Sequence, residues 1–269
     1  MCSLSAVTPV ADDRTRQAKF DGMSETDIFL LCGLILLVAM LYSSVGHGGA
    51  SGYIAAMALF GIAPAIMRPT ALVLNVLVAA MGTYRLHRAG LVNWQALMRL
   101  SAASIPMAFI GGTIQLPGDW YRRLVGLVLA AAAVRLFIDP RETRPMQPAI
   151  TPPLLPALVT GGGIGLLSGL TGVGGGIFLS PFLVLFGWAG ARQTSGITAP
   201  FILVNSVAGL AGNIVAVRAL PPELPFFAVA ALIGALIGTQ LGIRWLSPPV
   251  LLRLLAGVLV IAAVKFVFL

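Results

Sequence analysis

The chain has very few charged residues for its length. Charged side chains make up 10% of its 269 residues, whereas a soluble globular protein has about 25%. Hydrophobic residues make up 58%, and the mean hydropathy is +0.96. This composition argues against a soluble globular domain and indicates a membrane protein.

Acidic residues are missing from the middle of every long apolar run. All nine lie near the start of the chain, in predicted loops or at the ends of runs. A carboxylate buried in a membrane costs about 2.5–3.5 kcal/mol on insertion scales, and it is usually kept to handle cations or protons. The sequence therefore argues against a cationic substrate and against a proton relay built from acids.

Cysteines are few, and nucleotide-binding motifs are absent. The two cysteines, Cys2 and Cys32, can form neither a disulfide framework nor a metal cluster. We expect Cys32 to act as a small apolar filler. The sequence also lacks the phosphate-binding loop of ATPases. We therefore predict no metal, no cofactor and no ATP-driven motor in this chain.

Basic residues give the chain a formal net charge of +8. They lie mostly in loops and at the ends of apolar runs, where basic side chains anchor and orient membrane helices. No basic stripe with interleaved aromatic residues is present, so the expected partner is a lipid bilayer and not a nucleic acid. The polar first 26 residues lack the apolar stretch of a secretory signal, so we predict that the first span stays in the protein.

Ten apolar segments fill the rest of the chain, five in each half. Their lengths approach the ~20 residues of a spanning helix, and backbone amides in lipid must be bonded within their own segment. We predict an all-α, polytopic transmembrane helical bundle in the cell membrane. Its parts are a polar N-terminal tail (1–26), a first transmembrane repeat (27–138), a linker (139–153) and a second transmembrane repeat (154–269). The segments are 27–44, 50–67, 70–87, 96–115 and 121–138, then 154–170, 175–188, 197–217, 223–241 and 249–268.

The two halves follow one plan. The tract Gly46-His47-Gly48-Gly49 returns as Gly172-Val173-Gly174-Gly175-Gly176, and Phe60-Gly61 returns at the matching distance as Phe186-Gly187. Such internal repeats are typical of transporters whose site lies where the halves meet. Five crossings per half would invert the second repeat, whereas a re-entrant second segment in each half would make the repeats parallel. Both topologies are compatible with the sequence.

Each glycine tract should break a helix just before a short apolar segment. Glycine adopts positive φ and lets the backbone approach a ligand closely. A helix that starts after the tract has unbonded N–H groups and the positive end of its dipole, which together bind anions without a charged side chain. The alternative is that these glycines only allow close helix packing. The recurrence of the tract before two short segments favours the anion site.

Three side chains near the tracts could contribute to such a site. His47, which is replaced by Val173 in the second tract, could donate to an oxyanion or titrate during transport, or it could simply bond a nearby carbonyl. Asn75 and Asn205 occupy matching positions inside predicted spans, where an amide must find partners. They could bond the broken backbone of a tract or reach the substrate.

These residues resemble the sulfite exporter TauE/SafE family of four-TMS-repeat membrane permeases. The stretch 172–181, with its glycines followed by Pro181, is similar to the family's glycine-rich hallmark, and 46–52 is similar to its first-half counterpart. His47 and Ser51 depart from the bulkier apolar residues usual there. The resemblance implies secondary transport of a small anion, often a sulfur-containing one such as sulfite, thiosulfate or a sulfonate. The predicted substrate-binding residues are Gly46, His47, Gly48, Gly49, Asn75, Gly172, Gly174, Gly175, Gly176 and Asn205.

Two other functions are compatible with parts of the sequence. A passive anion channel could share the same fold. A rhomboid-like intramembrane serine protease is suggested by Gly49-Ala50-Ser51-Gly52, but Ser51 corresponds to Ile177 in the second half, and ten segments do not suit that fold. We therefore predict a non-enzymatic permease, as a monomer or a homo-oligomer, driven by an ion or solute gradient.

Overall fold

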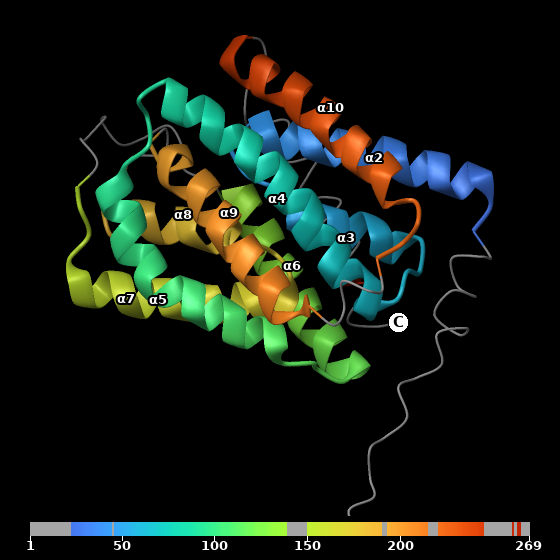
Figure 1. Ribbon diagram of the computed structural model, residues 1–269, viewed down its shortest axis with the longest axis horizontal. Coiled ribbons are helices and arrows are strands. Elements are labelled where there is room, and N and C mark those ends of the chain that lie inside the picture. Colours follow the sequence, from blue (N-terminus) through green and yellow to red (C-terminus); the bar gives the residue numbers. More distant parts are fainter. Residues whose placement is uncertain are drawn as a thin grey trace, which may run out of the picture.

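The computed structural model describes residues 23–44, 46–138, 150–189, 193–214, 220–244, 260 and 263–264. These described residues form helices and loops, without a strand, which confirms the predicted all-helical class (Figure 1). Most of the predicted tail and linker, and nearly all of the last predicted segment, lie outside them. The helices are α2 (Glu25–Ser44), α3 (Ala50–Leu59), α4 (Pro64–Arg88), α5 (Trp94–Thr113), α6 (Gly118–Ile138), α7 (Leu154–Thr171), α8 (Gly176–Leu185), α9 (Ser195–Gly212) and α10 (Leu224–Arg244).

Four of the helices are long and apolar enough to cross a membrane, namely α2, α4, α7 and α9. The short helices α3 and α8 have 10 residues each, or about 15 Å at the rise of an α-helix. A helix of that length cannot cross a hydrocarbon core of about 30 Å by itself. The chain thus combines four helices that can cross a membrane with two apolar helices that are too short to do so alone.

The second predicted segment is shorter than the sequence suggested. It was expected to reach residue 67, but α3 ends at Leu59 and α4 already begins at Pro64. Gly61 has a φ of 73° in the turn between them, and Pro64 occupies a first-turn position, where its missing amide proton costs little. Consequently Pro69, which falls between the predicted segments 50–67 and 70–87, lies inside α4, so the predicted boundary at this point was wrong.

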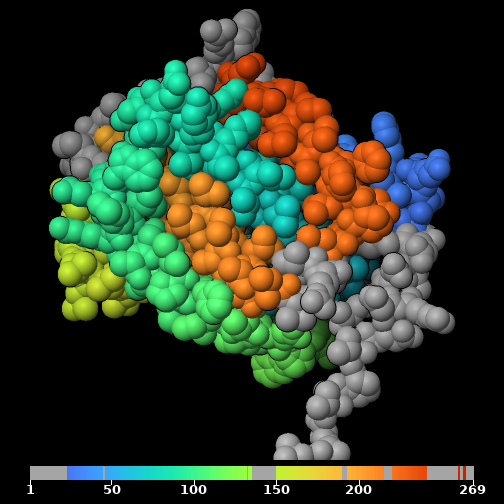
Figure 2. Space-filling model, viewed as in Figure 1, coloured from blue at the N-terminus to red at the C-terminus, as the bar shows by residue number. Residues whose placement is uncertain are grey.

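The most extensive helix pairings join the two halves of the chain. α5 packs along α7, and α2 packs along α10, with α4 and α9 in contact between these pairs (Figure 1). On the surface, α9 lies between α5 on one side and α4 on the other (Figure 2). In the order of segments, α5 and α10 hold the same place in their halves, as do α2 and α7. Each half therefore places its fourth helix against the first helix of the other half.

Glycines make these pairings close. A Cβ atom added at Gly161, Gly165 or Gly169 of α7 would lie 2.1–2.3 Å from a backbone carbonyl oxygen of α5. A Cβ atom added at Gly234 or Gly238 of α10 would lie 2.1–2.2 Å from a carbonyl oxygen of α2. Small residues at such spacing let membrane helices approach until their backbones touch. These helix glycines, which lie outside the tracts, therefore allow close helix packing. The sequence offered that role as the alternative for the tract glycines.

Two glycines of α7 offer a direct test of this packing. Gly165→Ala should lower the apparent melting temperature in detergent, because the new methyl group would lie 2.3 Å from the Ser104 carbonyl oxygen. Overpacking of this kind costs about 1–3 kcal/mol. Gly163→Ala is the matched control, because nothing lies within 4 Å of its added Cβ. Equal melting temperatures for the two variants would contradict the packing role of Gly165.

Candidate functional site

The first glycine tract separates α2 from α3. The end of α2 is closed by two backbone bonds, from the Gly46 amide to the Ser43 carbonyl at 3.1 Å and from the His47 amide to the Tyr42 carbonyl at 2.9 Å. The chain then turns through Gly49, whose φ of 100° is a left-handed conformation that favours glycine. Gly49 is the residue before α3, and no side chain caps this helix.

The second tract separates α7 from α8 in a similar way. Gly172 caps the C-terminus of α7 with a φ of 80°, and its amide donates to the Ser168 carbonyl at 2.8 Å. Gly174 and Gly175 also have φ values of 80°, which residues with a Cβ rarely adopt. Gly175 precedes α8, again without a side-chain cap.

Both short helices therefore begin with unbonded amide groups. In the described part of the chain, hydrogen bonds reach neither the amides of residues 48–52 nor those of residues 174–177. The first bonds of the two helices come from the Tyr53 amide to the Gly49 carbonyl and from the Phe178 amide to the Gly175 carbonyl. Each helix also presents the positive end of its dipole here. Two helix N-termini with unbonded amides thus come from opposite halves of the chain.

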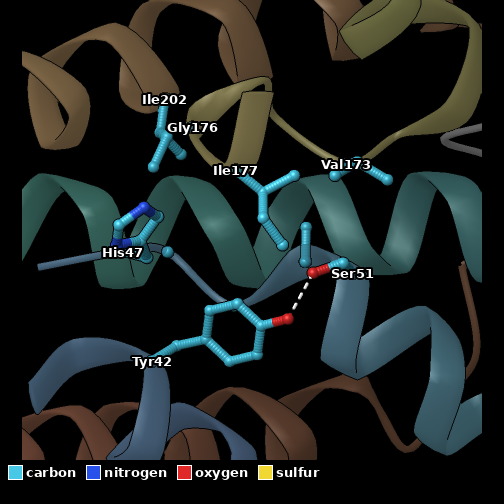
Figure 3. Close-up of a pocket in the computed structure, with 10 residues that line it drawn as sticks. Tyr42, His47, Ser51, Val173, Gly176, Ile177 and Ile202 are labelled. Carbon is cyan, nitrogen blue, oxygen red and sulfur yellow. Dashed lines mark hydrogen bonds between the residues drawn. The ribbon is translucent and has the colours of Figure 1, made fainter. Parts of the chain in front are cut away.

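A small pocket lies where the two tracts meet (Figure 3). Tyr42 is on one side, Gly176 and Ile202 are on the other, and His47 lies at one end. The cavity volume is about 10 Å³, which holds about one water molecule. The residues that line it are Tyr42, His47, Gly48, Gly49, Ala50, Ser51, Val173, Gly176, Ile177 and Ile202.

The side chain of Asn75 lies between the two tracts. A Cβ added at Gly48 would lie 2.1 Å from Asn75 Oδ1, and one added at Gly174 would lie 2.1 Å from Asn75 Nδ2. The Nδ2 group donates to Ser206 Oγ at 2.9 Å. Oδ1 is buried without a hydrogen-bond partner in the described structure. Asn75 of α4 therefore needs glycine on both sides and adds a buried polar group at the meeting point.

His47 connects the halves directly. Its Nε2 atom lies 2.8 Å from Ser180 Oγ, and the Ser180 hydroxyl donates to the Gly176 carbonyl at 3.1 Å. The Ser180 hydroxyl has one proton for the Gly176 carbonyl or for Nε2, so the imidazole tautomer decides which atom donates in the bond between His47 and Ser180. Ser51, the serine of the protease-like motif, is bonded instead to the Tyr42 hydroxyl at 2.5 Å.

Asn205 lies apart from the other predicted residues. Its Nδ2 atom donates to the Phe201 carbonyl of its own helix at 2.8 Å, and its Oδ1 atom accepts a hydrogen bond from Ser104 of α5. Both ends of the amide are therefore bonded, and its Oδ1 end joins α9 to α5. Of the other predicted residues, Gly48, Gly49, Gly176 and His47 line the pocket, and the remaining glycines set the backbone that leads to it.

Several residues at the site were not singled out from the sequence. Tyr42 and Ile202 line the pocket, and the Tyr53 hydroxyl donates to the Gly48 carbonyl at 3.0 Å. These residues stand in apolar helices, where an aromatic or aliphatic side chain is expected for packing alone. Ser206, which accepts the hydrogen bond from Asn75 Nδ2, directly follows Asn205 in the sequence. Within the described ranges, no three His, Cys, Asp or Glu side chains gather as metal ligands would.

Comparisons with known proteins agree with this architecture. The family model described as "Sulfite exporter TauE/SafE" matches residues 31–266. The chain is 37% identical over 246 residues to the "Probable membrane transporter protein y4hK" of Sinorhizobium fredii (strain NBRC 101917 / NGR234), an alignment that covers 91% of this chain and 100% of that protein. No solved structure matches the chain. The chain belongs to the TauE/SafE family of membrane transporters.

Proposed function

We propose that this membrane transporter is a secondary permease for a small anion, such as sulfite, thiosulfate or a sulfonate, which binds between the two glycine tracts. The observation that carries the proposal is the meeting of two uncapped helix N-termini, those of α3 and α8, at one pocket. Their amides and dipoles stabilise negative charge without a basic side chain. None of the lining residues is a carboxylate, so nothing charged there opposes an anion.

The pocket suggests how transport would proceed. A volume of about 10 Å³ is too small for an oxyanion with several heavy atoms, so binding requires the lining to move apart. The lining comes from both halves of the chain, and the His47–Ser180 bond joins those halves beside it. We infer that the halves shift around the anion and open the site to each side of the membrane in turn. A fixed open pore, as in a passive channel, would not need such a movement.

Ligand screening of the purified protein tests the substrate class. Sulfite, thiosulfate or methanesulfonate should raise the apparent melting temperature, because a ligand that binds the folded state stabilises it by about 2.7 kcal/mol at 100 times its Kd. Sodium and potassium chloride at equal ionic strength serve as controls. In proteoliposomes the same anion should show saturable counterflow, whereas linear flux without exchange would indicate a channel. A stabilising effect from cations alone would contradict the proposal.

Substitutions in the tracts test the site itself. Gly48→Leu and Gly174→Leu should each reduce anion transport to less than about a tenth of the wild-type rate, while the protein still inserts into the membrane. Each new side chain would meet the amide of Asn75, which lies between the two tracts. Gly33→Leu in α2 is the matched control, because nothing lies within 4 Å of its added Cβ. Normal transport in both tract variants would remove the tracts from the mechanism.

The bond between His47 and Ser180 can be tested by a double-mutant cycle. His47→Val, which copies the second tract, and Ser180→Ala should show a coupling of about 0.6 kcal/mol in unfolding free energy, the mean for hydrogen bonds between membrane helices. His47→Val should also change the relative rates for sulfite and thiosulfate, because the imidazole lines the pocket. Additive effects on stability with unchanged selectivity would limit His47 to packing.

A further inference from the structure

A buried arginine lies beside the second glycine tract. Arg68, in the second turn of α4, is 6% exposed. Its Nη1 atom donates to the Ile114 carbonyl at 3.0 Å, and its Nη2 atom donates to the carbonyls of Gly111 at 2.7 Å, Gly112 at 3.0 Å and Gly169. In the described part of the chain, its hydrogen bonds go to carbonyl oxygens and none reaches a carboxylate.

These carbonyls belong to the C-terminal ends of two helices. Gly111 and Gly112 are in the last turn of α5, Ile114 follows that helix, and Gly169 is in the last turn of α7. A helix C-terminus has a partial charge of about −0.5, so the two ends together balance about one positive charge. Arg68 therefore neutralises a pair of negative helix ends with a full cation, and no acid is needed.

The C-terminus of α7 lies close in sequence to the N-terminus of α8, where an anion would bind, so neutralising the C-terminus of α7 affects that anion. The chain passes from the C-terminus of α7 through 172–175 to the N-terminus of α8, so the negative end of one helix lies a few residues before the positive end of the next. An anion bound at α8 would be repelled by an unneutralised α7. The Arg68 side chain runs against this connection, because a Cβ added at Gly172 would lie 2.9 Å from its Cγ atom.

The described neighbour of the first tract at the corresponding position is a serine. Gly46 matches Gly172 in the repeat, and a Cβ added at Gly46 would lie 2.5 Å from the Cβ atom of Ser195. Among the described residues, Ser195 therefore lies beside Gly46 where Arg68 lies beside Gly172. A neutral donor also reaches the end of α7, because the Tyr121 hydroxyl donates to the Thr171 carbonyl at 3.0 Å. Neutral groups can therefore bond such carbonyls. The free-energy cost of burying the charged Arg68 side chain then needs a further explanation.

We propose that Arg68 is a positioning residue of the anion site: by neutralising the C-termini of α5 and α7 beside the second glycine tract, it keeps the electrostatic potential at the pocket favourable to a negative solute. This inference rests on the proposed function. Arg68 itself does not line the pocket, so it acts through the helix ends and the tract.

Two substitutions separate the charge of Arg68 from its hydrogen bonds. Arg68→Gln keeps an amide donor for the carbonyls but removes the charge, whereas Arg68→Lys keeps the charge but loses the planar group that reaches several carbonyls. The control is Arg99→Met, which removes a cation that donates to the Pro152 carbonyl at the other end of α5. The Kd values for sodium sulfite and sodium thiosulfate are measured by calorimetry on purified protein, and KM and maximal rate are measured in proteoliposomes.

Arg68→Gln should raise the Kd of the bound anion about tenfold, the size expected for a charge at a partly buried helix terminus. Arg68→Lys should keep the Kd within about threefold of wild type, and Arg99→Met should leave it unchanged. The KM should rise with the Kd while the maximal rate changes less. A lysine variant that binds as poorly as the glutamine variant, or a glutamine variant that binds like wild type, overturns the proposal.

If Arg68→Gln does not fold, Arg68→Lys decides alone. A Kd within threefold of wild type at a lowered melting temperature supports the role of charge, and a tenfold loss of affinity refutes it. If the proposed function is wrong, the wild-type protein will bind neither sulfite nor thiosulfate. The role proposed for Arg68 is then wrong as well.

Discussion

The requirement that backbone amides in a membrane find hydrogen-bond partners governs this structure. Most of the described chain satisfies it with α-helices, and loops such as 60–63 and 89–93 join them. The two glycine tracts are exceptions, because each leaves several amides unbonded at the start of a short helix, with both sets at one pocket. Protein surrounds these amides, and leaving them unbonded costs free energy. A ligand that accepts hydrogen bonds from them can offset that cost. An anion gains most from such an arrangement, since the helix dipoles add to the amide bonds.

Glycine has two separate roles in this chain. In α7 and α10 it allows helices of opposite halves to pack backbone against backbone, which holds the bundle together in a solvent that offers no hydrophobic driving force. In the tracts it allows positive φ and leaves room for Asn75 between the halves. The close packing of α5 and α7 also holds Arg68 in place. The two helices, which their glycines bring together, present the carbonyl oxygens that bond the Arg68 side chain.

The sequence predicted the helical class and the positions of both tracts, since long apolar runs and repeated glycines are local patterns. It also placed Asn75 near a tract. It did not predict that α4 would begin at Pro64, because the apolar pattern continues across the turn at Gly61 without interruption. The separation of Asn205 from Asn75 depends on which helices face each amide, and matching positions in a repeat do not reveal that. The partners of Arg68 come from two other helices, so only the assembled structure shows them.

The two short helices differ in their surroundings. All residues of α3 from Ala50 to Ala58 are buried, with Tyr53, Ile54 and Met57 fully enclosed. The far end of α8 is open, since Leu185 is 75% exposed and Phe186, just beyond the helix, is 54% exposed. Whatever surrounds the chain in the bilayer, acyl chains or a second copy, can therefore touch the far end of α8 directly, whereas protein covers α3 from Ala50 to Ala58. Bilayer thickness and lipid composition would act on the site from one side, through α8.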